Sequence, residues 1–199
     1  MTAEIVTSEA FQPTSLTTYF NNTSRTDAHA LDAGAFNIWR NTFPATELPE
    51  PGGTVVVGGV PFAFPGWRAD GADNVRCCGQ LLDIDPPGHY DWIYLLVAAE
   101  RRTEDPVLLH FAAGVVDQEW LRVSDFWPDA SAHFGELRAY QCSVLHYPRH
   151  TQERMPPTIW RQRVPVARAA ELRALRLPDN PAIHVFAMTL LSADRRIQR

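Results

Sequence analysis

Short runs of apolar and β-branched residues recur along the chain, and turn-forming residues separate them. Residues 90–99 and 182–190 form two long runs that are apolar on both faces, which predicts strands covered on both sides. Residues 107–113 and 118–123 are expected to pair across a Gly-containing turn, and residues 158–166 form a further predicted strand. Many short strands separated by turns are typical of an antiparallel β-sandwich or barrel.

Turn chemistry marks several of the junctions between these runs. Gly58-Gly59 separates residues 54–57 from residues 60–65, which predicts a hairpin. Asp85-Pro86-Pro87-Gly88 predicts a second turn. Leu177-Pro178-Asp179-Asn180-Pro181 predicts a tight turn before the last strand, because proline fixes φ while Asp and Asn tolerate a sharp bend.

The remaining segments have weaker patterns. Further strands are expected at residues 16–20, 36–40, 75–84 and 136–147. Short helical turns are expected at residues 44–48 and within residues 166–175, where Ala, Arg, Glu and Leu dominate. Residues 148–157 are expected to form a loop, because they are polar and rich in proline.

The length of the chain suits one domain, and the pattern contains neither a repeat of fixed period nor an alternation of strands with helices. We therefore predict a flexible N-terminal arm at residues 1–15, a single β-sandwich domain at residues 16–191 and a C-terminal tail at residues 192–199.

Composition narrows the function classes. All 18 basic residues are Arg, the net charge is -5, and the only basic cluster is at residues 195–199, so nucleic acid is not an expected partner. No apolar run approaches the ~20 residues of a membrane-spanning helix, and the N-terminus lacks the features of a signal peptide. Cys77, Cys78 and Cys142 form no disulfide framework. These features predict a cytoplasmic protein with no membrane partner.

Several short motifs follow one another along most of the chain. They are Tyr19-Phe20-Asn21-Asn22, Glu47-Leu48-Pro49, Gly59-Val60-Pro61-Phe62, Asp73-Asn74-Val75, Gly79-Gln80, Gly88-His89-Tyr90-Asp91, Val123-Ser124-Asp125-Phe126-Trp127 and Leu177-Pro178-Asp179-Asn180-Pro181. In this order, residues 16–191 resemble the galactose-binding-like β-sandwich modules appended to bacterial glycoside hydrolases.

This resemblance implies an all-β antiparallel jelly-roll β-sandwich with few short helical turns. It also implies a carbohydrate or glycoside ligand, and it adds a structural calcium ion as an option where no other cofactor is expected. Those modules usually belong to secreted multidomain enzymes, whereas this chain is expected to act alone inside the cell. Because one fold hosts many functions, the resemblance describes the scaffold better than the ligand.

Loop residues supply the candidate ligand contacts. A sugar presents apolar C–H faces and hydroxyl groups, so its site needs an aromatic platform beside polar donors and acceptors. The residues of this kind are Trp39, Arg40, Trp67, Arg68 and Asn74. The alternative is that both tryptophans cap the core while both arginines are solvated.

A second cluster predicts acid–base chemistry. His146, Arg149 and His150 are the candidate catalytic residues, since imidazole titrates near neutral pH, and Tyr147 between them is a candidate ligand contact. The alternative is that these are exposed loop residues without a role. His110 and His184 lie inside apolar runs and are interpreted as core histidines.

Asp70 and Asp73 are the candidate metal ligands, because they place carboxylates in a Gly-containing loop. The loop lacks the length and the final Glu of an EF-hand.

Three functions remain open. The first is a carbohydrate- or glycoside-binding module. The second is a small enzyme of specialised metabolism, a cyclase, isomerase or lyase that uses residues 146–150. The third is a structural or dimerisation module. A small molecule or sugar is the expected ligand, and a second copy of the chain is the expected partner in a homodimer.

Overall fold

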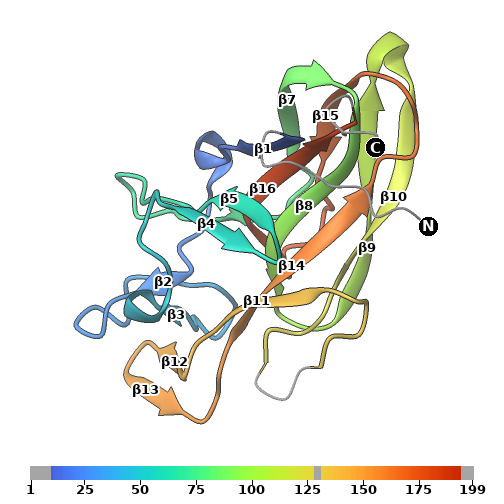
Figure 1. Ribbon diagram of the computed structural model, residues 1–199. Helices are drawn as coiled ribbons and strands as arrows, with labels where there is room; N and C mark the ends of the chain where they lie inside the picture. Colours follow the sequence, from blue (N-terminus) through green and yellow to red (C-terminus); the bar gives the residue numbers. More distant parts are fainter. Residues whose placement is uncertain (1–9, 128–130, 194–199) are drawn as a thin grey trace.

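The computed structural model describes residues 10–127 and 131–193. Over these residues the chain forms two antiparallel sheets that pack as a β-sandwich, and no described segment is an α-helix (Figure 1). The predicted all-β sandwich is confirmed. No helix in the described ranges is long and apolar enough to cross a membrane.

The larger sheet is built around the two apolar runs of the sequence. Its strand order is β1 (Phe11–Thr14), β16 (Ile183–Ser192), β8 (Tyr90–Ala99), β14 (Thr158–Pro165) and β11 (Leu137–Gln141), and β6 (Val75–Arg76) also pairs with β16. β8 and β16 pair over nearly their whole length, with Ile183 opposite Ala99 and Leu190 opposite Ile93. Each of them therefore has a neighbouring strand on both edges.

The smaller sheet has the order β10 (Val116–Val123), β9 (Thr103–Phe111), β15 (Leu172–Arg176) and β7 (Leu81–Gly88). Its inner face packs against the larger sheet, and the main core between them includes Leu82, Ile93, Leu109, Leu175 and Val185. Burial of an aliphatic side chain of this size contributes about 1.5–3 kcal/mol, so this layer supplies much of the free energy of folding.

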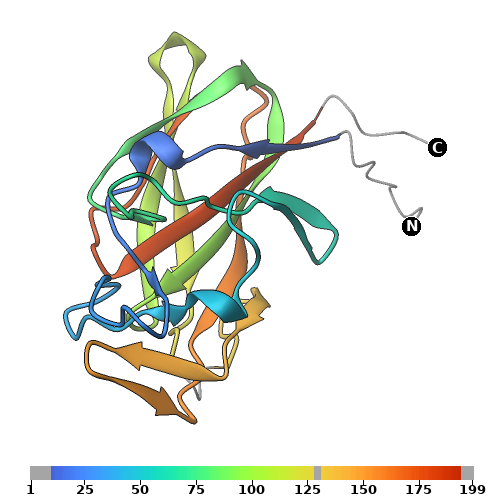
Figure 2. The same ribbon diagram turned by 90° about the vertical axis from the view of Figure 1, so that its left-hand side faces the viewer.

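A third layer, which we call the cover, lies on the outer face of the larger sheet. It contains β2 (Arg25–Thr26) paired with β3 (Phe43–Pro44), β4 (Thr54–Val57) paired with β5 (Val60–Ala63), and β12 (Val144–Tyr147) paired with β13 (His150–Glu153). Figure 2 shows the cover from its outer side, with β16 behind it. Leu96 and Phe186 of the sheet pack here against Phe43, Phe62 and Phe126. β8 and β16 are thus buried on both faces, as predicted.

The hairpins β4–β5 and β9–β10 confirm the predicted pairings, and the helical turn predicted at residues 44–48 is a 3₁₀ turn, η3 (Ala45–Glu47). Two other 3₁₀ turns, η2 (Thr17–Tyr19) and η4 (Ala112–Gly114), lie in the described part of the chain.

The beginning of the described chain differs from the prediction. The predicted arm at residues 1–15 includes β1, which pairs with β16 from Phe11 opposite Leu191 to Thr14 opposite Met188, and residues 1–9 lie outside the described ranges. The strand predicted at residues 16–20 is wrong, because this segment is η2. A single turn places Leu16 and Phe20 at its two ends, and both side chains are buried in the main core.

The strand predicted at residues 36–40 is also wrong. The Asn37 side-chain oxygen accepts hydrogen bonds from the backbone N–H groups of Trp39 and Asn41, at 3.0 and 3.1 Å. These local bonds replace the partners that a strand would offer and fold the segment into a turn. Arg40 completes this turn with a φ of 56°.

Other predicted elements are divided or displaced. Residues 75–84 contain two strands, β6 and β7, and residues 136–147 contain β11 and β12. β7 continues to Gly88 through the predicted turn at residues 85–88, and the predicted loop at residues 148–157 contains β13. The helical turn expected within residues 166–175 is absent from this described segment, which ends in β15 because its residues pair with β7 and β9. The predicted tail at residues 192–199 begins with Ser192, the last residue of β16, and residues 194–199 lie outside the described ranges.

Candidate functional site

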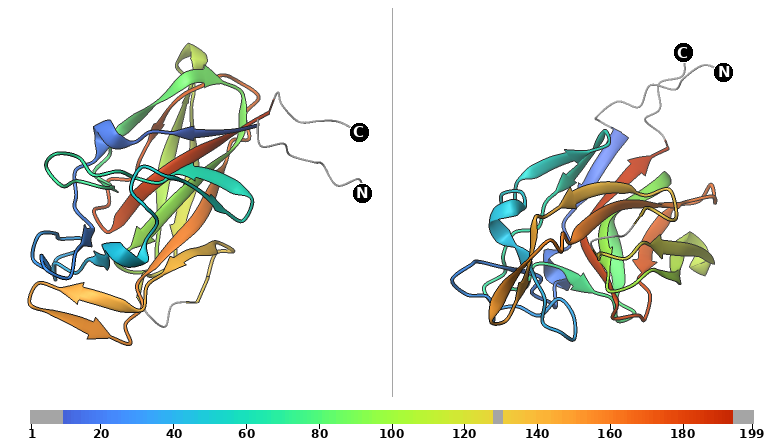
Figure 3. Two further views of the ribbon diagram at one scale, coloured as in Figure 1. Left: turned by 60° about the vertical axis from the view of Figure 1, so that its left-hand side comes forward. Right: turned by 90° about the horizontal axis from the view of Figure 1, so that it is seen from below.

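The predicted catalytic cluster lies in the β12–β13 hairpin, at the end of the molecule beside β2 and β3 (Figure 3). Tyr147 pairs with His150 across the two-residue turn, so His150 shares a face with Tyr147 and lies on the face opposite to His146. The rings of Tyr147 and His150 stack at 4.9 Å, and His150 and Arg149 are exposed. The hairpin turn therefore separates the two predicted catalytic histidines.

His146 points into the cover and is buried. Its Nδ1 atom lies 2.9 Å from the hydroxyl oxygen of Thr26, which in turn lies 2.6 Å from that of Thr42. Burial lowers the pKa of His146, although the carboxylates of Glu47 and Asp27 oppose this effect. The ring therefore joins β12 to β2 and β3, and the structure does not bring it together with Arg149 or His150.

The predicted ligand contacts lie in separate places. Trp39 is 66% exposed on its turn, and the Arg40 side chain donates a hydrogen bond to the carbonyl of Asp32 at 2.6 Å. Trp67 lies over the guanidinium group of the buried Arg25 at 4.3 Å. Trp67 lines one cavity of about 250 Å³, while Arg40 lines another. Trp39 lines neither of these cavities, so the two tryptophans do not form one platform.

The two predicted metal ligands both have partners within the chain. Arg68 and Asp70 form an ion pair at 3.1 Å, and the N–H group of Ala72, which donates to the carboxylate, lowers the pKa of Asp70. Asp73 is buried, and its carboxylate already accepts hydrogen bonds from the backbone and side-chain donors of Ser24, from those of Arg25 and from the Asn74 amide. No lone pair directed to a cation remains in this arrangement. No group of three candidate metal ligands occurs among the described residues.

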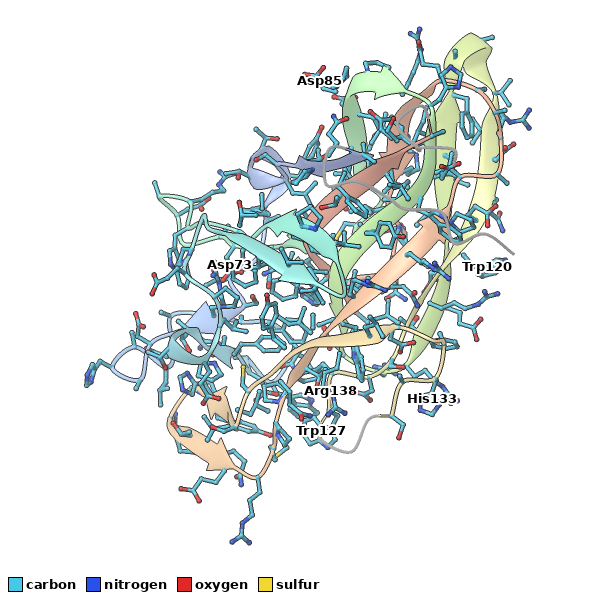
Figure 4. The ribbon with its side chains drawn as sticks, viewed as in Figure 1. Asp73, Asp85, Trp120, Trp127, His133 and Arg138 are labelled. Atoms are coloured by element: carbon cyan, nitrogen blue, oxygen red, sulfur yellow. The ribbon has the colours of Figure 1, made fainter. Side chains whose placement is uncertain are left out.

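Asp73 instead anchors a buried polar network beneath the cover. The Arg25 Nε atom donates to the Asp73 carboxylate at 2.9 Å, and both side chains have almost no contact with solvent. Figure 4 shows Asp73 on the cover side of the larger sheet, whereas Trp120 lies on the opposite side. A buried charged pair is costly unless its hydrogen bonds are satisfied, and this pair satisfies them with the two backbone donors of β2 and its neighbour.

The network continues through Asn74 to His184. The Asn74 amide donates to Asp73 at 2.7 Å, and its oxygen lies 2.9 Å from Nδ1 of His184. His184 is fully buried in β16, as predicted for a core histidine, and its ring packs on Phe36 with 4.1 Å between the ring centroids. Burial lowers the pKa of this imidazole, Glu100 opposes that effect, and Arg76 adds to it. Asn74, predicted as a ligand contact, thus belongs to the interior.

The network ends at a cavity on the surface. The Nε2 atom of His184 lies 3.9 Å from the carboxylate of Glu100, whose side chain is 12% exposed and follows the last residue of β8. Glu100 lines a cavity of about 370 Å³ together with Ile38, Arg76, Arg101 and Asn180. Arg76 reaches the same carboxylate at 3.7 Å. A titratable group at a cavity wall, backed by a buried partner, is a candidate functional site.

The family assignment agrees with this three-layer sandwich. The chain belongs to the AziU2-like β-sandwich family. The family model matches residues 11–194, from the first residue of β1 to just beyond β16. No curated protein matches the chain.

The AziU2-like domain therefore has a candidate site that its sequence signals only indirectly. His184 was predicted to lie in the core, which is correct, but Glu100 was not among the predicted site residues. Pairing the two apolar strands at their neighbouring ends, with Ile183 opposite Ala99, brings the two residues together. A polar residue at the end of each predicted strand was the available signal.

Proposed function

We propose that this AziU2-like domain is a small enzyme of specialised metabolism that performs acid–base chemistry on a small organic anion at the Glu100 cavity. The observation that supports the site is the contact between the cavity-lining carboxyl of Glu100 and the buried imidazole of His184. AziU2, after which the family is named, belongs to azinomycin biosynthesis, which supports a role in specialised metabolism.

Glu100 is the proposed catalytic residue. Many cyclases, isomerases and lyases use a positioned group that removes a proton while its bonding electron pair stays on the substrate. The carboxylate of Glu100 reaches the cavity, whereas the ring of His184 lies behind it and does not contact the cavity contents. Proton transfer of this kind requires no oxidant, reductant or metal ion.

Two arginines define the proposed class of substrate. The Arg76 Nε atom donates to the carbonyl of Pro181 at 3.0 Å, which fixes this guanidinium group beside the cavity. Arg101 also lines the cavity and is exposed, and its side chain forms no hydrogen bond within the described ranges. Guanidinium groups bind carboxylate and phosphate strongly, so we expect the substrate to carry such an anionic group next to the atom that exchanges its proton with Glu100.

A metabolite-consumption assay tests this proposal. The purified chain and a Glu100→Gln variant are incubated with a small-molecule extract of the source organism, and mass spectrometry follows the anionic components. We expect one of them to be consumed at a rate that Glu100→Gln lowers at least ~100-fold, the ordinary contribution of a general acid or base. Glu153→Gln, an exposed substitution on β13, is the matched control and should retain the full rate. Equal rates for the wild-type chain and Glu100→Gln, or no consumption, would contradict the proposal.

A carbohydrate or glycoside ligand is the second candidate, and the position of Trp39 favours it. This exposed indole follows Ile38, which lines the Glu100 cavity. An exposed aromatic face beside a cavity suits the C–H face of a sugar, in keeping with the resemblance to galactose-binding-like modules. A glycosylated metabolite that is bound and not consumed in the same assay would favour this candidate.

A further inference from the structure

The hydrogen-bond network fixes which ring nitrogen of His184 carries a hydrogen. The first residue of this chain of hydrogen bonds is Asn22. The Asn22 amide nitrogen donates to the carbonyl of Ala35 at 2.7 Å. The side-chain oxygen of Asn22 is therefore the atom that lies 3.1 Å from the Asn74 nitrogen. In this orientation, the Asn22 atom next to the Asn74 side chain is a hydrogen-bond acceptor.

The orientation of Asn74 follows from its neighbours. Its amide nitrogen faces three oxygens, those of the Asp73 carboxylate at 2.7 Å, the Asn22 backbone at 3.0 Å and the Asn22 side chain at 3.1 Å. Rotating the amide by half a turn would place an oxygen against three acceptors. The Asn74 oxygen is therefore the atom beside Nδ1 of His184, and because an amide oxygen only accepts, Nδ1 carries a hydrogen.

Nε2, the other ring nitrogen, carries no hydrogen in this tautomer and faces the Glu100 carboxyl group. In a neutral imidazole with its hydrogen on Nδ1, the Nε2 atom is an acceptor. Nε2 of His184 is buried and has no hydrogen-bond partner in the described part of the chain, and the Glu100 oxygen is 3.9 Å away.

We propose that His184 and Glu100 share one proton in the resting protein, held between Nε2 and the Glu100 carboxyl. A rotation of the carboxyl that shortens the gap by about 1 Å completes the hydrogen bond. The proton balances directly, because it leaves one of the two atoms and binds to the other, and the remaining atom keeps its lone pair.

The charged groups around the pair act in opposite directions. Burial of the ring favours the neutral imidazole and directs the proton to Glu100. Arg76, at 3.7 Å from Glu100, favours the ionised carboxylate and also lowers the pKa of His184, whereas Glu100 and the more distant Asp73 favour the protonated ring. Phe36, which covers the ring, carries no charge. The opposition leaves the proton exchangeable between the two groups.

The inference deepens the proposed function and rests on it for its role in catalysis. Glu100 would exchange its proton with the substrate, and His184 would replace or receive that proton from behind. His184 and Asn74 are then positioning residues, since neither contacts the cavity. The network back to Asp73 and Arg25 keeps the ring in the tautomer that Glu100 requires.

Nitrogen and carbon NMR of the isotope-labelled chain tests the shared proton. At neutral pH we expect Nδ1 of His184 to be protonated, and we expect the Glu100 carboxyl carbon and the His184 nitrogens to respond over the same pH ranges. Two groups that share a proton interact by more than about one pH unit. Glu100→Gln should therefore displace the His184 transition by at least that amount, and His184→Gln should displace the response of Glu100.

Glu104→Gln is the control, because this carboxylate pairs with Arg122 on the exposed surface. Protonation of His184 on Nε2 with a bare Nδ1, or independent responses of Glu100 and His184, would overturn the inference. Independent responses together with Glu100-dependent metabolite consumption would leave the proposed function intact. If Glu100 and His184 respond to pH together but no metabolite is consumed, the shared proton is supported and only the proposed function is contradicted. If His184→Gln does not fold, Glu100→Gln still tests the coupling through the displacement of the His184 transition.

Discussion

The β12–β13 hairpin and the Glu100 cavity both hold a buried histidine with a pKa lowered by burial, yet their surroundings differ. His146 meets the hydroxyl of Thr26, which satisfies the ring and joins three strands. His184 meets an amide on one side and a carboxyl at a cavity wall on the other. A hydroxyl adapts to either tautomer, whereas an amide oxygen fixes one. The hydrogen-bond partners of a histidine thus indicate its chemical role better than the number of histidines nearby.

The largest expected effect is on the network that only the His184 region has. Asp73→Ala leaves the buried guanidinium of Arg25 without its carboxylate. We expect the free energy of unfolding to fall by about 3–5 kcal/mol, the ordinary result of breaking a buried ion pair. Urea denaturation measures this change. Asp70→Ala, which removes an exposed carboxylate from the same loop, should leave stability nearly unchanged. Equal losses of unfolding free energy in Asp73→Ala and Asp70→Ala would show that the buried network does not stabilise the fold more than an exposed ion pair does.

A smaller effect concerns the buried histidine of the hairpin. The folded-state pKa of His146 lies below its ordinary value, so the unfolded chain binds a proton first as the pH falls. Stability due to the neutral ring is therefore complete above the unfolded pKa, near 6.5, and decreases as the pH falls below it. Unfolding free energies measured at about pH 7.5 and about pH 5.5 should show this loss.

The same measurements on variants assign the loss to residues. His146→Gln should reduce the dependence on pH, because burial lowers the pKa of this ring. A pH dependence that His146→Gln leaves unchanged would contradict this assignment.

Local sequence patterns predicted the parts of the fold that depend on neighbours in the chain. The strands β8 and β16 were evident because both faces are apolar, and β4–β5 because Gly58-Gly59 allows the turn. The segment at residues 36–40 was mispredicted because Asn37 bonds to its own backbone, and the segment at residues 16–20 because tertiary burial of its two ends favours one turn.

The candidate site could not be predicted in the same way. The cluster at residues 146–150 is close in sequence, but the hairpin turn directs its histidines to opposite faces. Glu100 and His184 are far apart in sequence, and only the register of β16 on β8 makes them neighbours. Asp73 has the composition of a metal ligand, but the backbone donors of residues 24 and 25 occupy its carboxylate. Register and burial are properties of the folded chain.

The comparison of Arg101→Ala with Arg149→Ala decides whether the reaction takes place at the Glu100 cavity or at the hairpin. Both residues are exposed, and each lies at the entrance to one of the two regions, the Glu100 cavity or the hairpin turn. The measurement is kcat/KM for the anionic metabolite identified by the consumption assay. An active site at the Glu100 cavity predicts at least a ~10-fold loss for Arg101→Ala, the effect of one charge-assisted hydrogen bond, and no more than a ~2-fold change for Arg149→Ala. A loss confined to Arg149→Ala would contradict it and place the active site at the hairpin.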